Sequence, residues 1–186
     1  MKNLRSKVIK YAKMLNSKKL SALRSGNIST RYKDGFFITP SGVKYSSLKS
    51  KDIVFVSLDG EFNRKKGTPS SEWRFHQDIY KNKIEVKAIV HAHSNYATAI
   101  STHGKRIPAF HYMVAMAGGN DIKCAKYATY GTRELSKNIL KALRFRNACL
   151  ISNHGQIALS ENLSKAFELA EEVENLSNQY IKALKI

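Results

Sequence analysis

Cysteine, proline and acidic residues are all scarce in this chain of 186 residues. The two cysteines, Cys124 and Cys149, form no CxxC pair and lie in apolar segments. This excludes a cysteine-rich disulfide or zinc-finger framework, and we expect both to be buried, reduced thiols. Only three prolines occur, and no proline- or glycine-rich linker divides the chain. We therefore expect a single globular domain over residues 1–186.

Long apolar runs are also missing. No run approaches the roughly 20 residues that span a bilayer, so no membrane segment is predicted. The first ten residues are charged throughout and lack the apolar block of a secretion signal. Leu4, Val8, Tyr11 and Leu15 instead form a helical stripe. We expect a first folded helix over residues 4–16, in a cytoplasmic protein.

The scarcity of acid leaves a large positive charge. The chain has 32 Lys and Arg against 14 Asp and Glu, a formal net charge of +18. Such a balance is found in nucleic-acid binders, in proteins with anionic small substrates, and in proteins with a lysine-rich solvated surface. There is no dense arginine run, zinc-finger spacing or RNA-binding signature. We therefore expect no nucleic-acid partner.

Hydrophobic patterning predicts a mixture of strands and helices. Turn signals at Lys33-Asp34-Gly35, Asp59-Gly60 and Asn153-His154-Gly155 indicate hairpins, which favour a mixed or antiparallel α/β sheet with helices on its faces. Strands are expected at residues 27–31, 36–39, 53–58, 87–93, 124–130, 148–152 and 156–160. Helices are expected at residues 4–16, 71–82, 95–103, 109–117, 133–144 and 162–183.

A pair of histidines, His91 and His93, comes at the end of an apolar strand. Residues i and i+2 of a strand point to the same side, so both imidazoles can reach one metal ion. His154, followed by Gly155, is the best candidate for a third ligand. Three histidines with an open position are typical of catalytic zinc, although imidazole suits other divalent ions as well. The alternative is that these are solvent-facing or hydrogen-bonded core histidines.

Three polar segments could bind an anion. Ser70 and Ser71, after Pro69, open a predicted helix, and Glu72 falls in its first turn. The segments Gly26-Asn27 and Thr39-Pro40-Ser41-Gly42 offer N–H and hydroxyl donors at strand ends. The alternatives are simple helix capping for the first segment and ordinary turns for the other two.

The remaining histidines carry weaker signals. His76 and His103 are interpreted as structural residues within and at the end of helices. His111 is a candidate for a supporting role in a site. The neighbouring Tyr112 is a candidate proton donor, with the alternative that it is an aromatic core residue.

These segments together resemble the class II aldolase/adducin family, and most of all its bacterial L-fuculose-phosphate aldolase branch. The matching strings occur in family order over residues 5 to 185 and are Gly26-Asn27, Ile38–Gly42 (ITPSG), Pro69–His76 (PSSEWRFH), His91-Ala92-His93, Ile107–Tyr112 (IPAFHY), Ala117–Asn120 (AGGN), Tyr127–Leu135 (YATYGTREL) and Asn153-His154-Gly155.

The resemblance implies a three-layer α/β/α fold with a central, largely antiparallel sheet. It also implies a homotetramer with sites between neighbouring subunits and one Zn²⁺ per subunit. The implied site residues are His91, His93 and His154 as metal ligands; Asn27, Ser41, Gly42, Ser70 and Ser71 around a substrate phosphate; Glu72 as catalytic carboxylate; and Tyr112 as a proton donor that reaches a neighbour's site.

The resemblance further implies a lyase that reversibly cleaves a ketose 1-phosphate of the L-fuculose 1-phosphate type. The products would be dihydroxyacetone phosphate and an aldehyde such as lactaldehyde. The aldehyde stays open, because the family's fuculose aldolases carry an aromatic residue on a C-terminal tail and the given sequence ends at Ile186. The alternatives are a ribulose 5-phosphate type 4-epimerase, which tends to carry Asp where this chain has Glu72, a thio-sugar phosphate dehydratase, and an adducin-like binding domain without metal.

Overall fold

The computed structural model describes residues 2–186, so Met1, the first residue of the predicted domain, lies outside it. Eight strands form one sheet in the order β3-β2-β1-β4-β8-β7-β6-β5. Neighbouring strands are antiparallel except for β6 and β7, which are parallel. The strands are β1 (Asn27–Tyr32), β2 (Gly35–Ile38), β3 (Val54–Ser57), β4 (Ala88–Ala92), β5 (Ile107–Pro108), β6 (Asp121–Ala125), β7 (Ala148–Ile151) and β8 (Gly155–Ser160).

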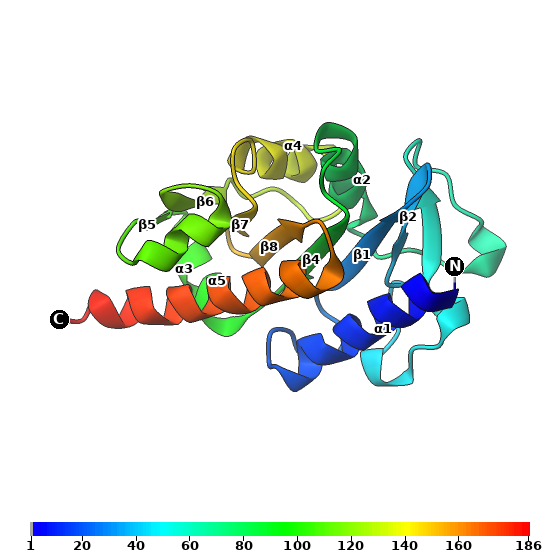
Figure 1. The fold of residues 1–186 in the computed structure, drawn as a ribbon, viewed down its shortest axis with the longest axis horizontal. Helices are drawn as coiled ribbons and strands as arrows, with labels where there is room; N and C mark the ends of the chain where they lie inside the picture. Colours follow the sequence, from blue (N-terminus) through cyan, green and yellow to red (C-terminus); the bar gives the residue numbers. More distant parts are fainter. Residues whose placement is uncertain (1) are drawn as a thin grey trace.

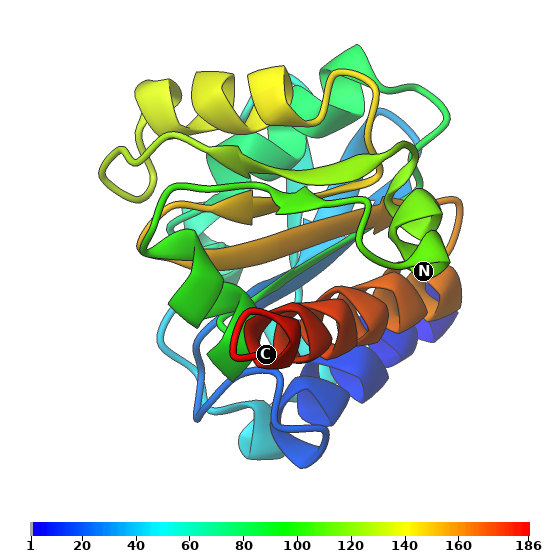
Figure 2. The same ribbon diagram turned by 90° about the vertical axis from the view of Figure 1, so that its left-hand side faces the viewer.

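Helices cover both faces of this sheet, as Figures 1 and 2 show. The α-helices of residues 2–186 are α1 (Lys2–Ser17), α2 (Trp73–Asn82), α3 (Asn95–Ser101), α4 (Arg133–Ala142) and α5 (Leu163–Ala183). Helices α2 and α4 lie on one face, and α1, α3 and α5 on the other. The predicted three-layer α/β/α architecture with a largely antiparallel sheet is confirmed.

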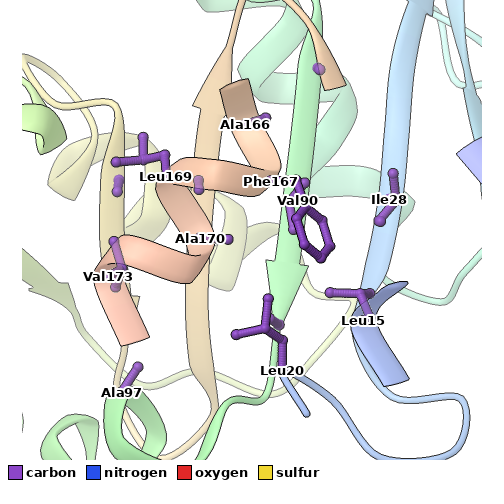
Figure 3. Packing of buried hydrophobic residues seen from close by; sticks show 14 of the residues in the cluster. Leu15, Leu20, Ile28, Val90, Ala97, Ala166, Phe167, Leu169, Ala170 and Val173 are labelled. Atoms are coloured by element: carbon purple, nitrogen blue, oxygen red, sulfur yellow. The ribbon is translucent and has the colours of Figure 1, made fainter. Parts of the chain in front are cut away.

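The core beneath α1, α3 and α5 is mostly aliphatic and also contains the buried aromatic rings of Phe37, Tyr45 and Phe167, the last from α5. Phe167 lies beside Val90 of β4, on the side facing Ile28 and Leu15, as Figure 3 shows. All four residues are at most 1% exposed. Phe167 therefore belongs to the apolar face with which α5 packs on the sheet.

A second core lies between the sheet and the pair α2 and α4. Phe75 and Ile79 of α2 meet Ile139 of α4 and the strand residues Phe36 and Ile157, and all are buried. Most predicted elements are confirmed within a few residues, including the β1–β2 hairpin and the β7–β8 hairpin. None of the helices in residues 2–186 combines the length and apolar character needed to cross a bilayer.

Three elements differ from their predictions in kind, position or pairing. Residues 109–117 form only a 3₁₀ helix, η4 (Tyr112–Ala117), because residues 107–108 pair as β5 and Gly118 ends the segment with a φ of 88°. The strand expected at 124–130 is β6 and lies earlier, pairing with β7. The Asp59-Gly60 turn leads into no partner strand, so β3 is an edge strand, and the chain continues into the 3₁₀ helix η3 (Arg64–Lys66).

Candidate metal centre and active site

Three histidines converge at one end of the central strands. His91 lies in β4, His93 follows the strand directly, and His154 lies in the turn between β7 and β8. The Nε2 atoms of His91 and His93 are 2.9 Å apart, and each pair of the three rings has a centroid separation of 4.8 Å. The prediction that these histidines come together is therefore correct.

The glycine after His154 allows this convergence. A Cβ placed on Gly155 would lie 2.3 Å from the carbonyl oxygen of Ala92 and 3.2 Å from the Cα of His93. No larger residue allows the β7–β8 turn to approach β4 so closely. The preceding Asn153, at a φ of 55°, turns the chain so that His154 faces the other two histidines.

A carboxylate joins the histidines from the other side. Glu72 immediately precedes α2, one residue earlier than the predicted position in its first turn, and has a φ of −100° and a ψ of 12°. Its Oε2 lies 3.1 Å from His91 Nε2, and its Oε1 lies 3.2 Å from His154 Nε2. One ligand atom from each of the four residues lies within 4.8 Å of the others.

Hydrogen bonding and burial leave the imidazole lone pairs free. His91 Nδ1 donates to the carbonyl oxygen of Gln156 at 2.8 Å, so the proton is on Nδ1 and the Nε2 lone pair faces the cluster. Burial lowers the pKa of His93 to about 3 and that of His154 to about 4. Burial alone raises the pKa of Glu72, but the neighbouring histidines, His91 foremost, outweigh it and lower the pKa to about 2.

This donor set fits a divalent cation. Glu72 Oε1 is buried and accepts no hydrogen bond in the structure, which is costly for a carboxylate oxygen. A cation held by the four residues would satisfy that oxygen and accept the imidazole lone pairs. Three nitrogen ligands and one oxygen ligand suit zinc and several other divalent ions of the first transition series.

The cluster opens into a pocket of about 380 Å³. The pocket contains every predicted phosphate-binding residue together with Glu72, His93 and His154, while His91 is buried behind it. Its lining residues are Arg24, Ser25, Gly26, Asn27, Pro40, Ser41, Gly42, Ser70, Ser71, Glu72, His93, Tyr127, Ala128, Tyr130, Asn153 and His154. A larger hollow of about 1010 Å³ lies beside β3 and contains none of the predicted site residues.

The two serine-containing loops are held together by their own backbones. The Ser41 N–H donates to the carbonyl oxygen of Thr68, and the Ser70 N–H donates to that of Thr39, each at 3.0 Å. These two N–H groups are therefore engaged, contrary to the expectation that they are available to an anion. Ser70 Oγ accepts from the Glu72 N–H at 3.4 Å, which leaves its hydroxyl proton free to donate to a ligand.

Sequence reasoning missed three pocket residues. Arg24 is the only lysine or arginine among the described residues that line the pocket, and its Nη1 donates to the Gly42 carbonyl oxygen at 3.2 Å. Tyr127 and Tyr130 are exposed aromatic residues on the loop after β6. Arg74 of α2 holds this loop through a hydrogen bond to the carbonyl oxygen of Gly131. A lone arginine two residues before Gly26 carried no pattern that distinguished it from the many other cations.

Tyr112 does not reach this pocket within the same chain. It is 81% exposed and lines a separate hollow together with Phe110 and His111. His111 caps η4 by accepting from the Met113 N–H through its Nδ1. A role for Tyr112 in the site requires that it reach the pocket of another subunit, as the family resemblance implies.

The comparisons with known proteins agree with this geometry. A sequence model described as the Class II Aldolase and Adducin N-terminal domain matches residues 6–181. The chain belongs to the class II aldolase and adducin family. The resemblance predicted from the ordered motifs is thereby confirmed.

Close relatives within the family are aldolases. The chain is 48% identical over 183 residues to the 5-methylthioribulose-1-phosphate/5-deoxyribulose-1-phosphate aldolase of Rhodospirillum rubrum, covering 98% of this chain and 82% of that protein. It is 49% identical over 162 residues to the L-fuculose phosphate aldolase of Escherichia coli, covering 87% and 75%. Aldolases are lyases, so the predicted enzyme class is confirmed.

A solved structure shows the same fold. An L-fuculose 1-phosphate aldolase superposes with a TM-score of 0.95 at 39% sequence identity, covering 98% of this chain and 87% of that one. The class II aldolase fold is therefore shown for this chain by structure as well as by sequence.

His76 provides a pH test of the buried site. It lies in α2, is fully buried, and burial lowers its pKa from 6.5 to about 3. The unfolded state thus binds the proton more tightly, and stability falls as the pH drops below about 6.5. At pH 5 the loss from this residue is about 2 kcal/mol.

We expect the stability advantage of wild type over His76→Gln to shrink by about 2 kcal/mol between pH 7.5 and pH 5. Urea unfolding at the two pH values measures it, and the other histidines contribute equally to both proteins. An advantage that is the same at both pH values would contradict the assigned pKa.

Proposed function

We propose that this chain is a zinc-dependent class II aldolase that reversibly cleaves a ketose 1-phosphate to dihydroxyacetone phosphate and an aldehyde such as lactaldehyde. The observation that carries the proposal is the position of Glu72. It contacts His91 and His154 at the base of a pocket that also contains hydroxyl groups and Arg24. A histidine cluster, a carboxylate and donors suited to an anion thus share one small volume, which supports the proposal.

His91, His93 and His154 would hold the metal, and zinc is the proposed ion because of the three imidazoles. When bound, a divalent cation supplies Lewis-acid stabilisation of negative charge on substrate oxygens. The hydrogen bond from His91 Nδ1 to the Gln156 carbonyl oxygen fixes the orientation of one ligand ring. The Ser21 hydroxyl, which accepts from the His93 N–H at 3.0 Å, fixes the backbone beside another.

The proposed phosphate pocket consists of polar groups from three loops together with the guanidinium group of Arg24. The expected ligand residues are Asn27, Ser41, Gly42, Ser70 and Ser71. Arg24 adds the only positive charge among the described residues of the lining, and its bond to the Gly42 carbonyl oxygen places it on this side of the pocket. Holding the phosphate here fixes the dihydroxyacetone half of the substrate through contacts remote from the breaking bond.

Glu72 is the proposed general acid/base. Its low pKa keeps it ionised, and Asn27 Nδ2 donates to its Oε2 at 3.0 Å, which leaves Oε1 as the oxygen without a hydrogen bond. In cleavage, the carbon that becomes nucleophilic must regain a proton, and in synthesis it must lose one. A fixed carboxylate within the pocket can transfer this proton in both directions.

Tyr112 is the proposed proton donor or acceptor for the hydroxyl of the aldehyde half, acting in a neighbouring subunit of a homotetramer. Its 81% exposure, next to the partly exposed Met116 on the same 3₁₀ helix, supports a place on a surface between subunits. The predicted cytoplasmic location remains part of this proposal.

Two ketose 1-phosphates are the leading substrates. L-Fuculose 1-phosphate follows from the sequence motifs and from the Escherichia coli relative. A 5-deoxyribulose or 5-methylthioribulose 1-phosphate is favoured by the Rhodospirillum rubrum relative, whose similarity covers more of both chains. Both kinds of substrate share the dihydroxyacetone phosphate half and differ only in the aldehyde.

A panel of ketose phosphates tests the reaction. We expect purified protein to release dihydroxyacetone phosphate from L-fuculose 1-phosphate or 5-deoxyribulose 1-phosphate, measured with a coupled triose-phosphate assay. Glu72→Gln is the matched control, since it keeps the shape of the side chain and removes the base. It should retain the fold but lose at least about a hundredfold in rate. Formation of an epimer without triose phosphate would establish the 4-epimerase alternative instead.

Metal content tests the centre independently of activity. We expect about one divalent ion, zinc, per chain by elemental analysis of the purified protein, and loss of that ion in His93→Ala. His103→Ala is the control, because His103 lies outside the cluster and is exposed. Equal metal content in the two variants would remove His93 from the centre.

Arg24 tests the assignment of the phosphate. Arg24→Ala should raise KM for the ketose 1-phosphate about tenfold or more with a smaller change in kcat, because the lost contact is remote from the breaking bond. Arg144→Ala removes the same charge from an exposed site outside the pocket and should change KM little. Equal effects of the two variants would indicate general surface charge rather than a local contact.

A further inference from the structure

A chain of buried polar side chains leads from Glu72 away from the pocket. Asn27 Nδ2 contacts Glu72 Oε2 at 3.0 Å, and Asn27 Oδ1 contacts His76 Nε2. On the far side of the imidazole, His76 Nδ1 contacts Ser29 Oγ at 2.7 Å, and Ser29 Oγ contacts the Tyr80 hydroxyl at 2.7 Å. Each of the four residues beyond Glu72 is at most 1% exposed.

Two secondary-structure elements build this chain. Asn27 and Ser29 are residues i and i+2 of β1, so they point to the same face of the sheet. His76 and Tyr80 are residues i and i+4 of α2, so they lie one turn apart on the same face of the helix. The polar contacts therefore form a line along the β1–α2 interface inside the otherwise apolar second core.

The chemistry of the members fixes the direction of every hydrogen bond. The Asn27 amide nitrogen faces Glu72 Oε2 and can only donate, so Oε2 accepts, and the amide oxygen Oδ1 on the other side must accept. His76 therefore carries its proton on Nε2. Its Nδ1 must then accept from the Ser29 hydroxyl, whose oxygen accepts from Tyr80.

Two pKa shifts agree with this assignment. Burial lowers the pKa of His76 to about 3, so the ring is neutral and has a single N–H. Burial also raises the pKa of Tyr80 well above its usual range, so the phenol keeps the proton that it donates. Every donor in the chain thus points toward the Glu72 carboxylate.

The tautomer of His76 determines whether the nitrogen or the oxygen of the Asn27 amide is directed at Glu72. With the proton on Nδ1 instead, His76 Nε2 and Asn27 Oδ1 would be two acceptors in contact. The amide would then have to turn over, which would place its oxygen against the carboxylate. The first arrangement loses the hydrogen bond between His76 and Asn27, and the second leaves Glu72 without its donor, so each costs a buried hydrogen bond.

We propose that His76 is a positioning residue for Glu72, acting through Asn27. It holds the Asn27 amide in the orientation that binds Oε2 and leaves Oε1 directed at the metal centre. This inference rests on the proposed function, in which Glu72 transfers the proton. The alternative is that His76 only fills space, since its ring stacks on Phe75 with a centroid separation of 4.7 Å.

Two substitutions at one position separate these roles. The side-chain amide nitrogen of Gln reaches about the place of Nε2, and that of Asn reaches about the place of Nδ1. His76→Gln can therefore still donate to Asn27, whereas His76→Asn cannot. We expect kcat for ketose 1-phosphate cleavage to stay within about threefold of wild type in His76→Gln and to fall about tenfold or more in His76→Asn. KM and bound metal should change little in both.

Thermal unfolding of both variants provides the stability control. Equal losses of kcat in the two variants, or full activity in His76→Asn, would overturn the proposal, because a space-filling role does not depend on which nitrogen donates.

A tautomer measurement keeps the proposal testable if a variant fails to fold or if wild type does not cleave the substrates. Two-bond ¹H–¹⁵N spectra of the histidine rings distinguish protonated from unprotonated nitrogens, and one soluble His76 variant assigns the wild-type signal by its absence. We expect the proton on Nε2. A proton on Nδ1 overturns the chain of hydrogen bonds, whereas absence of cleavage with the proton on Nε2 overturns only the proposed function.

Discussion

The register in which β1, β4 and β8 pair is the constraint on which the site depends. Asn27 lies opposite His91 in one pair, and in the other His91 lies opposite Ile157 and Ala92 opposite Gln156. This pairing brings the Gln156 carbonyl oxygen to His91 Nδ1 and the Asn27 amide to Glu72. A slip of one residue would turn His91 to the opposite face of the sheet. The hydrogen bonds that build the sheet therefore also set the geometry of the cluster of three histidines and Glu72.

Patterns local in sequence were enough to predict much of the site. The two-residue spacing of His91 and His93 and the glycine after His154 each have a direct steric consequence that the structure displays. The order of strands was not predictable from the residues alone, because it depends on contacts between distant segments. The hydrogen bonds from the Ser41 and Ser70 N–H groups to carbonyl oxygens of the facing loop were not predictable either, because the pairing of two loops leaves no pattern in the sequence.

The hydrogen-bonded side chains of Asn27, His76, Ser29 and Tyr80 between β1 and α2 constrain the fold as well as the site. Buried hydroxyl, amide and imidazole groups destabilise a core unless each finds a partner. Here each member contacts the next in only one alignment of helix and strand, so the helix cannot slide along the sheet without losing several bonds at once. An apolar interface would tolerate small shifts, and such shifts would move Glu72, which immediately precedes the helix.

The positive charge of the protein also affects the edge of the sheet at β3. Strand β3 ends the sheet, a position that invites pairing with another chain, and on its outer side the Ser57 backbone is bonded to Gly60 and Glu61 of the following turn. It is only four residues long, and Lys51, Lys65 and Lys66 line the hollow beside it. Two such edges that approach each other bring like charges together. Repulsion between these lysines therefore opposes pairing of two copies along β3.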